Sequence, residues 1–125
     1  MNISMPTFSD LVREVLEKLL ADMDDDLRLQ AGEVLVYSSD APDNTCGYSS
    51  NHNLLGLYQG VPRPKRTVFA PVPHPPDTIT IFRRAHLRLC RNRAELRREI
   101  RATLIHEFGH YFGFSERELA ARGLN

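Results

Sequence analysis

The chain has 125 residues, of which 42% are hydrophobic and 26% are charged, and its 16 Lys and Arg balance its 16 Asp and Glu. This length and composition predict a single globular domain, residues 1–125, with one modest core. No apolar run is long enough to cross a bilayer, and the N-terminus lacks the basic start and apolar segment of an export signal. We therefore expect a cytoplasmic protein that has no membrane partner.

Acidic and basic residues are unevenly distributed along the chain. Residues 1–50 hold ten Asp and Glu against three Lys and Arg, whereas residues 51–125 hold thirteen Lys and Arg against six Asp and Glu. A basic stretch such as Arg83–Arg101 can bind nucleic acid, but no aromatic residues that would stack on bases are interleaved here. We expect these arginines to be solvated or paired with the acidic N-terminal half, and we expect no nucleic-acid partner.

The N-terminal half predicts one helix and two strands. Apolar residues recur at helical spacing over about residues 8–21, after a capping-box pattern at Thr7–Asp10. The aspartates at 22 and 24–26 have no EF-hand spacing and are interpreted as an acidic turn. Residues 32–37 and 54–60 predict strands, separated by a loop over residues 38–53. Glycines within the second strand indicate close approach by another backbone.

The C-terminal half predicts a loop, a strand and two helices. Residues 62–76 hold six prolines and are interpreted as a long extended loop that could include a short strand at 67–69. Residues 77–82 alternate cleanly and predict a third strand. A long helix is predicted over about residues 92–112, capped at Asn92, and a short one over about 116–122, with Ser115 and Glu118 as a capping box. This order of elements predicts an α+β fold.

The predicted long helix has distinct faces. Apolar side chains at Leu96, Ile100, Leu104, Ile105, Phe108 and Phe112 predict that most of it is buried. Glu99, Thr103, His106 and His110 share one face. The two cysteines, Cys46 and Cys90, form no C-x-x-C pair, and we expect both to be free thiols.

The motif H-E-x-x-H occupies residues 106–110 and continues as x-x-G-x-x-E to residue 116. Two histidines four residues apart on a helix point the same way, so His106 and His110 can hold one Zn²⁺ ion from one face. Glu107 then lies close enough to take a proton from a water molecule that the metal activates. Gly113 tolerates the left-handed conformation that ends helices, which lets the chain turn back.

A third metal ligand is predicted at Glu116, which a sharp turn after Gly113 can bring back toward the histidines. Glu116 would also stand in the first turn of the short last helix, where a carboxylate is favoured without any metal. An upstream His or Asp is the competing ligand. The same donors accept Fe, Mn or Co as well as Zn²⁺.

Three segments together carry a family resemblance: residues 54–62, residues 76–83, and His106–Glu116. They resemble the small bacterial zincin-like metallopeptidases, the minimal zincins, whose signature is H-E-x-x-H-x-x-G-x-x-D. The resemblance covers most of residues 30–125. It implies an N-terminal helix, a small mixed sheet of three to four strands, a buried active-site helix and a short C-terminal helix. It also implies that His106 and His110 bind the metal and that Glu107 is the general base, with Glu116 standing where the family usually has aspartate.

These observations favour a zinc metallopeptidase whose partner is a peptide or protein substrate, with the peptide added as a strand beside residues 54–60. Two alternatives stay open. One is a metal-dependent, ribonuclease-like hydrolase that uses the arginine-rich stretch to bind phosphates. The other is a non-catalytic zinc-binding module, because Tyr58, His74 and Tyr111 are the only candidates we find for stabilising an oxyanion, and each has an ordinary packing role open to it.

Overall fold

A computed structural model describes residues 1–43, 53–65 and 75–125. In chain order these residues form α1 (Met5–Asp22), α2 (Asp25–Ala31), β1 (Leu35–Ser39), β2 (Gly56–Gln59), the 3-10 turn η2 (Arg63–Lys65), β3 (Thr78–Phe82), α3 (Arg83–Leu89), α4 (Arg93–Phe112) and α5 (Glu116–Ala121). The expectation of an α+β fold with a small mixed sheet is confirmed, and the sheet has three strands in the described part of the chain.

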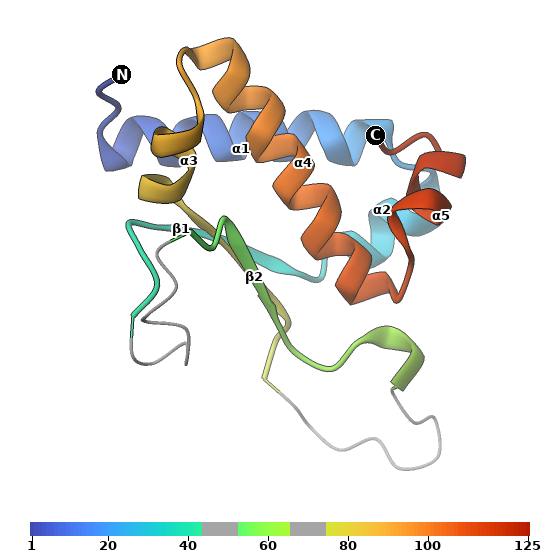
Figure 1. Ribbon diagram of the computed structural model, residues 1–125. Helices are drawn as coiled ribbons and strands as arrows, with labels where there is room; N and C mark the ends of the chain where they lie inside the picture. The colour runs from blue at the N-terminus through green and yellow to red at the C-terminus, as the bar shows by residue number, and fades with distance from the viewer. Residues whose placement is uncertain (44–52, 66–74) are drawn as a thin grey trace.

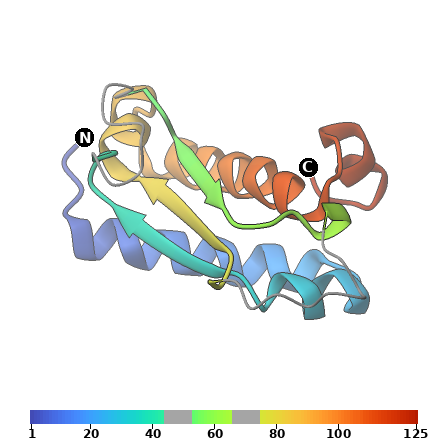
Figure 2. The ribbon, with the colours of Figure 1, turned by 90° about the horizontal axis from the view of Figure 1, so that it is seen from below.

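The strands lie in the order β1-β3-β2 (Figures 1 and 2). β3 is central, with β1 parallel and β2 antiparallel to it. Ile79 and Ile81 of β3 have no exposed surface, whereas Thr78 and Thr80 are half-buried. This alternation is the period-two pattern of a strand with one covered face.

Helices α1 and α4 cover the same face of the sheet (Figures 1 and 2). α1 packs against β1, while α4 packs against β2 and β3 and crosses α1. The apolar residues of these elements form one core, and its largest fully buried members include Phe8, Leu19, Ile100, Leu104, Phe108 and Tyr111. Burial of this apolar face, rather than helix propensity, fixes the position of α4.

The ends of α4 follow the sequence closely. Asn92 is its N-cap, accepting a 2.9 Å hydrogen bond from the amide of Glu95. Gly113 ends the helix in the left-handed conformation, with φ of 73°. A Cβ at Gly113 would also lie 2.5 Å from Cγ of Pro64, so the turn needs glycine for both conformation and space. The predicted capping box of α5, between Ser115 and Glu118, is present.

Two predictions for the N-terminal half were wrong. α1 begins three residues earlier than expected, because Ser4 caps it through the amide of Thr7 and Pro6 fits the first turn, where no amide donor is needed. The acidic stretch is the start of a helix rather than a turn, since Asp24 accepts a 2.9 Å hydrogen bond from the amide of Leu27. The next two aspartates lie in the first turn of α2, where the helix dipole favours carboxylates.

The first strand and the basic stretch also differ from expectation. β1 begins at Leu35 rather than at Gly32, because Gly32 is the C-cap of α2. Helix α3 directly follows β3 and was not predicted. No side chain caps its N-terminus, and no glycine or proline separates it from the strand, so the sequence carries no start signal.

The basic half pairs with the acidic half, as expected. Arginines of η2, α3 and α4 and the C-cap of α5 form ion pairs with N-terminal carboxylates in the described structure: Arg63–Glu33, Arg83–Asp40, Arg84–Asp40, Arg97–Glu14, Arg101–Asp22 and Arg122–Asp24. Cys90 is a buried free thiol, and burial raises its pKa above the ordinary value.

Some predictions fall on residues that the structure does not describe. These are most of the loop at 38–53 with Cys46, and the strand suggested at 67–69 with most of the proline-rich segment. Within the described residues, no helix combines the length and apolar character needed to span a bilayer.

Candidate metal centre

Helix α4 turns one face to the core and the other to a cleft. Phe108 and Tyr111 lie in the core, whereas His106 and His110 are exposed on the opposite side. The helical repeat explains this division, since residues four apart share a face. The prediction that His106 and His110 project from the same face of the helix is therefore confirmed.

The two imidazoles converge. Nε2 of His106 lies 3.3 Å from Nε2 of His110, and the ring planes are at 87° to each other. Two nitrogens that each bind Zn²⁺ at about 2.0–2.1 Å in tetrahedral geometry lie about 3.3 Å apart. The observed separation therefore fits a single zinc ion held by both histidines.

Glu107 lies beside this pair and is buried. Its Oε1 accepts a 2.9 Å hydrogen bond from the amide of Tyr58 in β2, and its Oε2 lies 4.0 Å from Nε2 of His106. Burial raises the pKa of Glu107 above its ordinary value, and the charges of His106 and His110 and the Tyr58 amide oppose this rise. Potential ligand atoms of His106, Glu107 and His110 all lie within 4.8 Å of one another.

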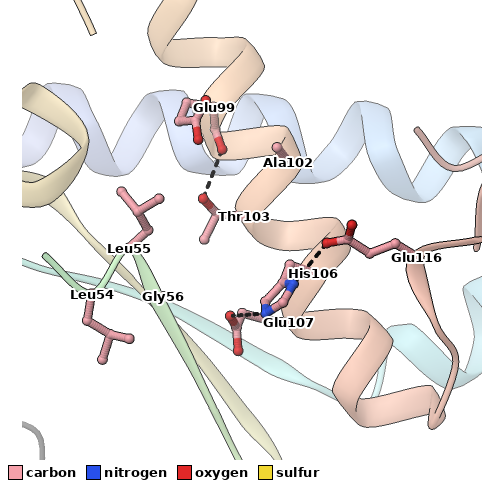
Figure 3. Close-up of a pocket in the computed structure, with 9 residues that line it drawn as sticks. All are labelled: Leu54, Leu55, Gly56, Glu99, Ala102, Thr103, His106, Glu107 and Glu116. Atoms are coloured by element: carbon pink, nitrogen blue, oxygen red, sulfur yellow. Dashed lines mark hydrogen bonds and ion pairs between the residues drawn. The ribbon is translucent and has the colours of Figure 1, made fainter. Parts of the chain in front are cut away.

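Glu116, the predicted third ligand, contacts His106 on the side of the ring away from the point where the two histidines converge. Its Oε1 lies 3.0 Å from Nδ1 of His106 (Figure 3). Nδ1 is the ring nitrogen that does not face His110, because Nε2 does. Because an ionised carboxylate only accepts hydrogen bonds, Nδ1 carries the hydrogen, and Nε2 of a neutral His106 presents its lone pair toward His110. Such a carboxylate fixes the orientation of a metal-binding histidine. The role of Glu116 as a direct ligand remains a prediction.

Two upstream residues that could replace Glu116 as the third ligand, His86 and Asp77, are buried and bonded to other groups. His86 is fully buried, with Nδ1 donating to the carbonyl of Phe82 at 2.8 Å and Nε2 at 3.0 Å from Oγ1 of Thr103. Asp77 is buried and accepts hydrogen bonds from the Tyr58 hydroxyl and the Val61 amide. His52 and His74 lie outside the described residues.

Two of the three candidates for oxyanion stabilisation have other partners. The hydroxyl of Tyr111 donates to the carbonyl of Gln30 at 3.0 Å, on the core side of α4. The hydroxyl of Tyr58 donates to Asp77 at 3.1 Å. The third, His74, lies outside the described residues. Neither tyrosine lines the cleft.

A cleft of about 340 Å³ opens beside His106. The start of β2 forms one wall and α4 the other, with α5 contributing one carboxylate (Figure 3). Its described lining is Leu54, Leu55, Gly56, Glu99, Ala102, Thr103, His106, Glu107 and Glu116. Of the four residues predicted to share one face of the helix, Glu99, Thr103 and His106 line this cleft, whereas His110 is not part of its described lining.

Sequence reasoning missed the bond from the Tyr58 amide to Glu107. The only signal was the glycine in the second strand. A Cβ at Gly56 would lie 2.7 Å from Cγ2 of Thr103 and 3.3 Å from Cγ of Glu107. Gly56 therefore lets β2 approach α4 closely, and the close neighbours beyond the sheet are side chains of that helix.

A protein-family model matches most of the chain. The model of the family described as zincin-like metallopeptidase matches residues 29–124, which include all three strands of the sheet and helices α3, α4 and α5. No curated protein matches the chain. The matched span covers nearly the whole chain and includes His106, Glu107, His110 and Glu116. The chain therefore belongs to the zincin-like metallopeptidase family.

Proposed function

We propose that the protein is a zinc-dependent peptidase, in which His106, His110 and Glu116 bind the ion and Glu107 is the general base. The observation that carries this proposal is the convergence of the two Nε2 atoms at 3.3 Å beside a buried carboxylate. A zinc ion bound there would act as a Lewis acid, polarising the scissile carbonyl and lowering the pKa of a water molecule.

Glu107 has the features of a base in such a site. Its raised pKa makes the carboxylate a better proton acceptor than an exposed one, and Oε2 faces the histidines while Oε1 is held by Tyr58. In the proposed reaction Glu107 takes a proton from the attacking water and delivers it to the leaving amine.

The outer edge of β2 suits an extended peptide. The Phe82 amide donates to the Leu55 carbonyl at 2.9 Å, so in this antiparallel pair the backbone groups of Gly56 and Tyr58 point away from β3. The Tyr58 amide does so in the structure, where it reaches Glu107. A peptide added beside β2 would lie between the strand and the histidines.

Glu116 enters this proposal as the third ligand. Its side chain is 76% exposed, so a change of rotamer is not hindered by packing. The alternative role for Glu116 is to keep its hydrogen bond to Nδ1 of His106 and so orient the ring. The ribonuclease alternative loses support, because many arginines of the basic half are engaged in ion pairs with the acidic half.

The test is peptide cleavage by zinc-loaded protein, measured by mass spectrometry on a diverse peptide library. Glu107→Gln should retain zinc while hydrolysis falls by about 10²–10⁴-fold, because the amide cannot accept the proton. Glu17→Gln, a distant exposed change of the same kind on α1, should cleave like the wild type. Equal cleavage by Glu107→Gln would exclude Glu107 as the base, and zinc binding with no cleavage at all would favour the non-catalytic alternative.

A further inference from the structure

The cleft extends from His106 to Glu99, which lies seven residues before His106 on the same face of α4. Seven residues of α-helix span about 10 Å along the axis. An extended strand covers that distance in about three residues. A side chain of a peptide held at the histidines can therefore reach Glu99.

The walls between these two points suit a long aliphatic stem. Leu54 and Leu55 line the β2 side, and Ala102 lines the helix side, where its small side chain leaves room (Figure 3). Leu54 and Leu55 are half-buried, so they present apolar surface to the cleft without filling it. Lysine and arginine bury such stems along apolar surface while their charged ends reach a polar partner.

The charge of the lining is entirely acidic apart from His106. Glu99, Glu107 and Glu116 contribute carboxylates, and no Lys or Arg occurs among the cleft residues that the structure describes. At the end of the cleft away from His106, a cation would be attracted by the Glu99 carboxylate, whereas an acidic side chain would be repelled.

Glu99 also differs from the comparable carboxylates of the protein. Four acidic residues are half-buried in the described chain, and Glu14, Asp40 and Glu95 each pair with an arginine. In the described structure the Glu99 side chain forms no ion pair with Lys or Arg, and its backbone carbonyl accepts from the Thr103 hydroxyl. Its negative charge also acts to raise the pKa of the buried His86 and Cys90. A carboxylate with reduced hydration and no cation of its own is a favourable partner for one supplied by a ligand.

We infer that Glu99 selects a lysine or arginine side chain of the substrate, close to the bond that is cleaved. This inference rests on the proposed peptidase function, and it adds the substrate class: peptides with a basic residue near the scissile bond. Glu99 forms the charged end of the pocket, and Leu54, Leu55 and Ala102 form its apolar sides.

The cleavage test uses one peptide frame in which lysine, arginine, norleucine or glutamate is placed in turn at each of the two positions on either side of the bond. The enzyme with bound zinc should cleave the best lysine or arginine peptide about tenfold faster than its norleucine counterpart. Glu99→Gln should lose this preference, Glu99→Arg should favour the glutamate peptide, and the control Glu17→Gln should keep the wild-type preference.

A binding measurement separates this inference from the proposed function. Fluorescence anisotropy with Glu107→Gln protein, which should not cleave, reports affinity for labelled lysine and norleucine peptides. The lysine peptide should bind about tenfold more tightly, and the added Glu99→Gln change should remove the difference. If no peptide is cleaved but this charge-dependent binding is seen, the peptidase proposal fails and the role of Glu99 stands. A wild-type preference that survives Glu99→Gln, or the absence of any preference for a basic side chain in both assays, would overturn the inference.

Discussion

The amide of Tyr58 donates a 2.9 Å hydrogen bond to Oε1 of Glu107, and so joins the edge strand β2 to helix α4 across 49 residues of sequence. The bond holds a buried carboxylate in place beside His106, with its other oxygen 4.0 Å from Nε2. It gives Glu107 a structural role that can be measured without metal or substrate.

Glu107→Gln and Glu107→Ala should therefore differ in stability. Glutamine keeps an oxygen that accepts from the Tyr58 amide and removes a buried charge, so we expect the metal-free variant to be at least as stable as the wild type. Alanine removes the acceptor and should be less stable than glutamine by about 1–3 kcal/mol. Urea unfolding of the metal-free wild type and of the two variants measures these differences in the free energy of unfolding. Equal stability of the two variants would show that the bond to Tyr58 contributes nothing.

Gly56 should be intolerant of a methyl group. A Cβ there would lie 2.7 Å from Cγ2 of Thr103, in addition to close contacts with the Thr80 carbonyl and Glu107. We expect Gly56→Ala to destabilise the protein by about 1–3 kcal/mol, because the helix and strand must move apart. Thr103→Ser keeps the hydroxyl near His86 but removes Cγ2, so it should partly restore the stability of Gly56→Ala. Unfolding curves of the wild type, the two single variants and the double variant measure this coupling. Additive effects of the two substitutions would show that the contact between positions 56 and 103 is unimportant.

His86 should make the protein less stable in mild acid. Burial lowers its pKa below the ordinary value of 6.5, so as pH falls the unfolded chain takes up a proton before the folded one does. The stability that neutral His86 contributes is complete above about pH 6.5 and is lost as pH falls toward its folded pKa. The difference in unfolding free energy between the metal-free wild type and His86→Gln should therefore shrink from pH 7.5 to pH 5. A difference that is constant over this range would contradict this prediction.

The two roles open to Glu116 can be separated by comparing Glu116→Gln with Glu116→Ala. If Glu116 is a direct ligand, both variants lose zinc affinity to a similar degree, because an amide is a poor zinc ligand. If it only orients His106, glutamine still accepts the Nδ1 hydrogen bond and alanine does not, so alanine alone should show a loss of about 10–100-fold. We expect the first pattern, and competition titration with a zinc chelator distinguishes the two.

The parts of the fold that the sequence predicted well have strong local signals. Helix α4 has a capping asparagine, a terminal glycine and buried apolar faces, and β3 alternates from Thr78 to Ile81. Helices α2 and α3 have seven residues each, which is too short for periodicity to be clear. The start of α1 was misplaced because both Ser4 and Thr7 can cap a helix, and in the structure Ser4 is the N-cap.

The site was predictable in composition but not in its contacts. The spacing of His106 and His110 fixes a common face, because helix geometry is regular. The atom that Glu116 reaches depends on the turn between α4 and α5, and the partner of Glu107 depends on where β2 packs. Both are tertiary relationships, and sequence spacing alone does not determine them.

The most direct test is to titrate zinc into metal-free protein and measure how many ions each chain binds. Calorimetric titration, and elemental analysis after dialysis, give this number for the wild type and for His110→Ala. We predict one zinc ion per chain in the wild type and a loss of tight binding in His110→Ala, with both proteins folded by circular dichroism. A wild type that binds no zinc, or a His110→Ala variant that binds it as tightly, would contradict the proposal that the two imidazoles hold the metal.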